Sequence, residues 1–118
     1  MDSARTARLI SAGVDVEDAL ERFMGNEAIL ERFLRKFLDD PNYGLLLQAI
    51  EAQDWPGALA ASHTLQGICG NLSFCRLLPL LTRQVEPLRA VRQELAAGLM
   101  EEITAAYQDA AAAIRELS

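Results

Sequence analysis

The chain has 118 residues, of which 51% are hydrophobic, and this length suits one compact domain with a buried core. Its formal net charge of −6 at pH 7 argues against a nucleic-acid partner, because binding a phosphate backbone needs clustered cations. Alanine, leucine, glutamate and arginine are abundant while β-branched and aromatic residues are sparse, and this composition favours helices.

The N-terminal part contains short helical patterns. Residues 1–12 are an extension that can form a short helix over residues 3–11. Asp15 can cap the next helix, in which apolar residues recur at the i, i+3, i+4 and i+7 spacing, and Gly25 can end it in a left-handed conformation. Residues 13–118 are expected to form the helical bundle domain.

The next predicted helices begin at an asparagine and at an aspartate. Asn26 can cap the clearest amphipathic pattern in the chain, with an apolar stripe opposite charged residues. Asp40 followed by Pro41 predicts another start, because proline fits the first helical position, and this helix should end near Gln53.

The second half of the chain predicts further helices with one break. Asp54 starts a helix that should run to about Gly70, and residues 71–73 interrupt the pattern before an apolar stripe resumes over residues 74–85. Pro79 lies within that stripe, so we expect either a kink or a later start.

The last predicted helix runs from about Val91 to Leu117, with Leu95 in its apolar stripe, and Gly98 should weaken it only slightly. No strand-period segment, long linker or internal repeat occurs. The sequence therefore predicts an all-α fold in which five or six antiparallel helices, joined by short loops, form a bundle.

Cysteine usage and hydropathy bear on location. Cys69 and Cys75 lack the spacing of a zinc site or a CxxC redox motif, and we expect both thiols to stay reduced. No apolar run approaches the ~20 residues of a membrane span, and the N-terminus lacks a signal-peptide core. We expect a soluble, cytoplasmic chain with no membrane partner.

The only histidine, His63, lies in the stretch SHTLQGICGNLS. On a helical wheel at ~100° per residue it faces away from the apolar stripe of its own helix, and should therefore face solvent. That stripe consists of Ala58, Ala61, Leu65, Ile68 and Leu72.

The face around His63 carries small side chains. Gly67 and Gly70 lie at +4 and +7, although a glycine inside a helix costs about 1 kcal/mol relative to alanine. We interpret them as clearance that lets a bulky partner reach the ring; an ordinary surface histidine, with glycines that mark close helix packing, is the competing interpretation. The expected docking surface consists of Leu59, Ala60, Gly67 and Gly70, with Ile68 at its edge.

The segment AASHTLQGICGNLS resembles the signature of histidine-containing phosphotransfer (HPt) domains, approximately AHxLKGxxxxLG. The flanking segments GVDVEDALERFMGNEAILERFLRKF and DWPGALAASHTL are also similar to bacterial members, so the resemblance covers about residues 13–115. The residues that match the signature in order are His63, Thr64, Leu65, Gly67, Gly70, Asn71 and Leu72.

This resemblance implies an antiparallel four-helix bundle with one or two additional short N-terminal helices. It also implies a phosphorelay protein whose exposed histidine, here His63, accepts and donates a phosphoryl group between aspartates of receiver domains. The implied partners are receiver domains of response regulators or a hybrid sensor histidine kinase. The resemblance places Mg²⁺ on the receiver, and we expect no metal or cofactor in this chain. Because the sequence has no Gly-rich nucleotide loop, we expect a phosphotransfer intermediate without autokinase activity.

Two positions depart from the signature. Gln66 replaces its lysine and can donate an amide hydrogen bond to a phosphoryl group without a charge, so we expect a weaker or more labile phosphohistidine. Ser73 replaces a glycine and is expected to cap a helix that starts at Phe74. Side chains that could approach His63 in place of the lysine, unless they are simply solvated, are Arg76, Arg83 and Gln84.

Two other interpretations stay open. The neutral Gln66 suits an HPt-like adaptor that binds receiver domains or kinases without transferring phosphate. A helical bundle with an accidental resemblance is the other.

Overall fold

The computed structural model describes residues 1–117, and every regular element among them is a helix, which confirms the predicted all-α class. None of these helices is both long and apolar enough to cross a membrane. In chain order the helices are α1 (Ser3–Ser11), α2 (Val16–Arg22), α3 (Glu27–Leu38), α4 (Asn42–Glu51), α5 (Trp55–Asn71), α6 (Leu77–Arg89), α7 (Gln93–Gly98) and α8 (Met100–Arg115).

Local capping signals fix several helix starts as predicted. The side chains of Asp15, Asn26 and Asp54 each accept a hydrogen bond from the backbone N–H three residues later, at 3.0–3.1 Å. After α2 the chain turns through Met24 and Gly25, both with positive φ, of 56° and 77°. The left-handed ending predicted at Gly25 is therefore confirmed.

Two prolines lie at helix starts that differ slightly from the predicted ones. Helix α4 begins at Asn42, after Pro41, and the Asp40 carboxylate accepts from the Asn42 N–H at 2.9 Å. Helix α6 begins at Leu77, which confirms the later start. Pro79 then lies in its first turn, where a backbone N–H has no helical acceptor in any case.

The prediction that Ser73 caps a helix is wrong. Ser73 follows α5 with a φ of 59°, in the left-handed region that favours glycine. Its hydroxyl donates to Asp18 Oδ2 at 2.5 Å and its carbonyl accepts from the Asp15 N–H at 2.9 Å. These hydrogen bonds, to the start of α2, hold serine in a backbone position that suits the glycine of the HPt signature.

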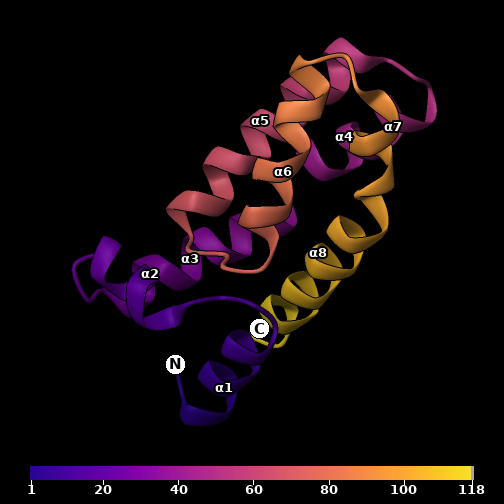
Figure 1. The fold of residues 1–118 in the computed structure, drawn as a ribbon. Coiled ribbons are helices and arrows are strands. Elements are labelled where there is room, and N and C mark those ends of the chain that lie inside the picture. The colour runs from indigo at the N-terminus through magenta and orange to yellow at the C-terminus, as the bar shows by residue number, and fades with distance from the viewer. Residues whose placement is uncertain (118) are drawn as a thin grey trace.

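The single helix predicted over residues 91–117 is also wrong. Helix α7 ends at Gly98 and α8 begins at Met100, so the chain bends at the intervening Leu99 (Figure 1). Leu95 is 58% exposed and does not belong to the buried stripe. The bend lets α7 pack on α6 while α8 continues along α3 and α6 towards α1.

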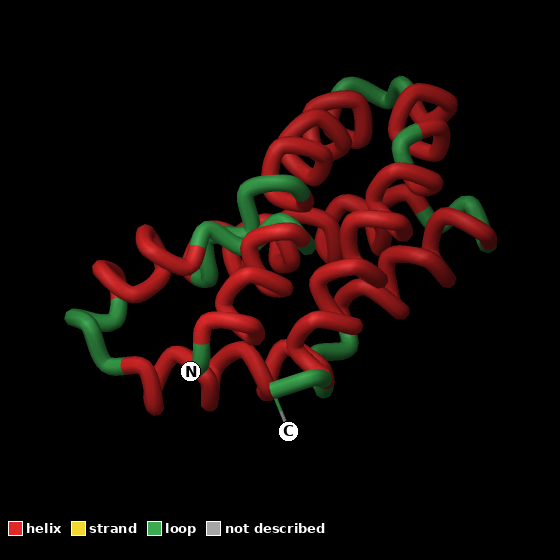
Figure 2. The backbone as a smooth tube through the Cα atoms, turned by 90° about the horizontal axis from the view of Figure 1, so that it is seen from below, coloured by secondary structure: helices red, strands yellow, loops and turns green. Residues whose placement is uncertain are grey.

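The helices form an elongated bundle in which α5 lies between α4 and α6, and α8 contacts α1, α3 and α6. Both termini lie at the same end, where α1 packs beside the end of α8 (Figures 1 and 2). Arg8 pairs there with Glu116 at 3.2 Å, and the Leu9 side chain is fully buried. The extension over residues 1–12 is therefore packed into the same core as the rest of the described chain.

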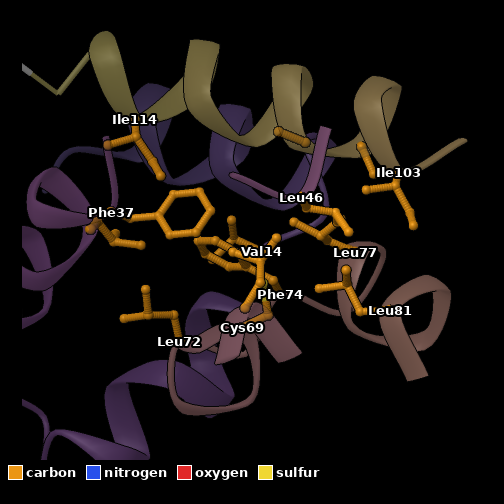
Figure 3. Packing of buried hydrophobic residues seen from close by; sticks show 14 of the residues in the cluster. Val14, Phe37, Leu46, Cys69, Leu72, Phe74, Leu77, Leu81, Ile103 and Ile114 are labelled. Carbon is orange, nitrogen blue, oxygen red and sulfur yellow. The ribbon is translucent and has the colours of Figure 1, made fainter. Parts of the chain in front are cut away.

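The core behind α5 is built on aromatic and aliphatic contacts (Figure 3). The rings of Phe37 and Phe74 meet edge to face with centroids 4.7 Å apart, and Val14, Cys69 and Leu72 lie around them. Val14 also forms an isolated antiparallel bridge with Phe74. These contacts fix one face of α5 inward and so determine which of its residues meet solvent.

Candidate functional site at His63

Helix α5 buries the face that the wheel predicted, with small differences at its edges. Ala58, Ala61, Leu65 and Leu72 are buried, whereas Ile68 is only half-buried. Ser62 and Cys69, which the predicted stripe did not include, are fully buried on the same side.

Both cysteines are free thiols. Burial raises the pKa of the Cys69 thiol. Cys75 is exposed, and its thiol donates to the Gly13 carbonyl at 3.3 Å.

A buried polar cluster fastens α5 to its neighbours. The Ser62 hydroxyl donates to Gln84 Oε1 at 2.8 Å, and both side chains are fully buried. Gln84 Nε2 donates to the Ala96 carbonyl at 3.0 Å and contacts Met100 Sδ at 3.2 Å. The cluster joins α5, α6, α7 and α8 directly behind His63, so the backbone that carries the imidazole is held from the core side.

His63 itself is exposed, as predicted. The α5 side chains that form hydrogen bonds are Ser62, Thr64 and Gln66, and in the part of the chain that the structure describes the imidazole has no hydrogen-bond or ion-pair partner. The ring therefore stands on the surface with both nitrogens free of other side chains.

The space over Gly67 and Gly70 is open. A Cβ atom added at either position would meet no heavy atom within 4 Å. At Gly13, by contrast, it would come within 2.7 Å of Arg76 Cβ, so that glycine is required by packing. Close packing between helices therefore does not explain the two glycines beside His63, and the competing interpretation loses its account of them.

Gln66 reaches across to α6. Its Nε2 donates to Thr82 Oγ1 at 3.0 Å, and that hydroxyl in turn donates to the Leu78 carbonyl at 3.0 Å. Since residues i and i+3 are neighbours on a helix, Gln66 follows His63 on the same side of α5, with its amide turned towards α6. One N–H of the amide is used by Thr82 and the other remains available.

Of the other predicted docking residues, Ala60 lies on the α4 side of the histidine. Ala60 is exposed and lines a groove of about 470 Å³ between α4 and α5, to which Leu45 and Thr64 also contribute. Leu59 is half-buried and packs against the core, so only part of its side chain is accessible to a docking partner.

The side chains proposed to replace the missing lysine lie elsewhere. Arg76 pairs with Asp109 at 2.9 Å and donates to the Ser11 carbonyl at 2.6 Å, and Gln84 is buried. Arg83 lines a groove shared with α7 and the start of α8. The predictions for Arg76 and Gln84 are therefore wrong, because each is engaged in long-range contacts that the sequence does not reveal.

Comparison with protein-family models, with curated proteins and with solved structures yields no match to this chain. Within residues 1–117, no group of three or more His, Cys, Asp or Glu side chains is placed to hold a metal ion. The site therefore consists of one exposed imidazole, a neighbouring amide and an open surface.

Proposed function

We propose that the chain is a cytoplasmic HPt-like phosphorelay protein in which His63 accepts a phosphoryl group from a receiver-domain aspartate and passes it to another. The observation that carries this proposal is the open space over Gly67 and Gly70, beside an exposed imidazole. Two glycines destabilise the monomer by about 1 kcal/mol each and no contact within it requires them. Access for a partner accounts for both.

The chemistry needs little from this chain. A neutral imidazole nitrogen attacks the phosphorus of an aspartyl phosphate in line; the N–P bond forms while the P–O bond breaks, and the electron pair of that bond leaves with the aspartate carboxylate. The reverse step, on a second receiver, regenerates the imidazole.

In this proposal Gln66 supports the phosphoryl oxygens. Its hydrogen bond to Thr82 orients the amide, and its second N–H can donate to a phosphoryl oxygen. A neutral donor stabilises the phosphoryl dianion less than a lysine ammonium does. The phosphohistidine is therefore expected to be short-lived, which suits a relay intermediate.

The helix contacts support a four-helix bundle as part of this proposal. Helices α3 and α4 would together form one interrupted helix of the bundle, and α5, α6 and α8 would be the other three. In this arrangement α4 packs on α5, α3 packs on α8, and α6 contacts both α5 and α8. The outer face of α5 would then be open to a docking partner.

The test is phosphoryl transfer from purified receiver domains that have been phosphorylated with a small-molecule donor. Wild-type protein should acquire acid-labile, base-stable label, and His63→Gln should acquire none. Equal label on the variant, or no label on wild type from any receiver in a broad panel, would contradict the proposal.

Gln66 also supports a second candidate, an adaptor that binds receivers without accepting phosphate. Among residues 1–117 no lysine or arginine side chain forms a hydrogen bond with Gln66, and the Gln66 amide donates to Thr82 Oγ1. If Gln66→Lys alone creates phosphorylation at His63 while wild type only binds the receiver, the adaptor is correct. If wild type is labelled and Gln66→Lys only lengthens the lifetime of the label, the relay is correct.

A further inference from the structure

A second surface feature lies away from the imidazole, in a cleft between α2, α3 and the C-terminal end of α5. Its volume is about 580 Å³, within the range of about 300–1,000 Å³ that small-molecule sites occupy. The side chains that line it are Arg22, Phe23, Phe33, Lys36, Phe37, Asp40, Ile68, Asn71 and Leu72.

The floor of this cleft is apolar and partly exposed. Phe37 and Leu72 are buried at its base, while the Phe23 and Phe33 rings meet at its wall with centroids 5.2 Å apart and their planes tilted by 33°. The Phe33 side chain is 41% exposed, so the wall of the cleft presents aromatic surface to solvent. An apolar ligand part placed here would remove aromatic surface from water.

The rim of the cleft carries cations with unused donors. Arg22 Nε pairs with Asp18 at 3.0 Å, and no hydrogen bond in the described chain uses its two terminal nitrogens. Lys36 Nζ lies 5.3 Å from the centroid of the Phe33 ring and has no ion-pair partner among residues 1–117. The single acid at the rim, Asp40, already accepts two hydrogen bonds from Asn42.

We propose that this cleft binds a small amphiphilic anion, whose apolar part lies against the Phe23 and Phe33 rings and whose anionic head group lies between Arg22 and Lys36. The lining carries two cations and one carboxylate, and the terminal nitrogens of Arg22 and the Lys36 ammonium have donors to offer a negative head group, although Arg22 Nε pairs with Asp18, in a chain whose net charge is −6. Because the floor is apolar, we expect a purely polar anion to bind this cleft more weakly than an amphiphilic one.

The cleft borders the histidine face without reaching the ring. Asn71, on its α5 wall, follows His63 by eight residues, which corresponds to about 12 Å along a helix. Ligand binding therefore does not require the imidazole, and the inference stands independently of phosphotransfer.

Decanoate is a suitable probe, used below its micellar concentration, with 1-decanol and decyltrimethylammonium as neutral and cationic counterparts. Titrations followed by ¹H–¹⁵N spectra should show saturable 1:1 binding of decanoate, with shifts confined to backbone amides around the cleft. Decanol should bind more weakly and the cation weakest. Unsaturable shifts spread over the whole surface, or equal affinity for all three probes, would overturn the proposal.

Matched variants on α3 locate the site. Lys36→Gln should weaken decanoate binding about two- to fivefold, the range for one exposed charge, whereas Arg32→Gln, which changes an exposed cation outside the cleft, should not. Phe33→Ala should weaken it about tenfold, and His63→Gln should leave it unchanged. Equal effects of the Lys36 and Arg32 changes, in folded variants, would show that the cleft does not hold the head group.

Discussion

Removing one buried hydroxyl behind the histidine should destabilise the whole bundle measurably. Ser62→Ala deletes the donor that lies 2.8 Å from Gln84 Oε1 and leaves this fully buried oxygen without a partner. An orphaned buried acceptor costs about 1–3 kcal/mol, and the better helix propensity of alanine offsets roughly 0.5 kcal/mol. The net loss of unfolding free energy should therefore be about 0.5–2.5 kcal/mol.

Urea denaturation followed by circular dichroism measures this loss. With a denaturant slope of about 2 kcal/mol/M, the midpoint should fall by roughly 0.3–1.3 M. Thr64→Ala is the control on the same helix, because the Thr64 hydroxyl is exposed and donates only to the Ala60 carbonyl one turn back. That change should be neutral or slightly stabilising.

A double-mutant cycle isolates the pair. In a Gln84→Leu background the Ser62→Ala change orphans no Oε1 and removes a buried hydroxyl that has lost its acceptor, so it should be neutral or stabilising. An unchanged midpoint for Ser62→Ala alone, or an equal loss in both backgrounds, would refute the assignment of this hydrogen bond as the contact that holds α5.

Two further outcomes test other parts of the fold. Leu9→Ala should lower the unfolding free energy by about 2–5 kcal/mol because Leu9 is fully buried, whereas Ile10→Ala, at a position 57% exposed, should change it little; equal effects in urea denaturation would show that α1 is not part of the core. The pKa of Asp18 is held below its usual 3.8 by the hydrogen bond from Ser73 and then by that from Arg22, so its carboxylate stabilises the fold above about pH 4 and loses this effect as the pH falls through the lowered pKa. Asp18→Asn should therefore be less stable than wild type at pH 6, and the gap should close on acidification towards pH 2 to 3, as measured by urea midpoints; a constant gap contradicts this linkage.

Local signals in the sequence sufficed for most helix starts. The caps at Asp15, Asn26 and Asp54 depend on contacts three residues apart, which any single sequence contains. The outward orientation of His63 followed in the same way from the period of the helix and the apolar stripe opposite it. Such features need no knowledge of distant partners.

The features that sequence reasoning missed all depend on contacts between distant segments. Ser73 adopts a left-handed backbone because Asp15 and Asp18 bind it, and nothing in the residues around Ser73 signals this. Gln84 looks like a surface residue until Ser62 and Ala96 are found beside it. A polar side chain that is fully paired can be buried, and pairing over 12 to 22 residues in sequence is not visible in a local pattern.

The break between α7 and α8 has the same origin. An apolar period continues through Gly98 and Leu99, so a single helix was the natural prediction. The structure instead ends α7 there, and the Ala96 carbonyl accepts from Gln84 on α6. Packing against α6 decides the geometry of this segment, which leaves Leu95 on the outside.

The central claim is that the glycines beside His63 keep it open for a docking partner, and a matched pair of substitutions tests it most directly. Gly67→Leu and Gly44→Leu both place a side chain where a Cβ meets nothing within 4 Å, on α5 and on α4, so both variants should fold. We predict that phosphoryl transfer from a receiver to His63 falls at least tenfold for Gly67→Leu and is unchanged for Gly44→Leu. Undiminished transfer to Gly67→Leu, in a folded protein, would contradict the account.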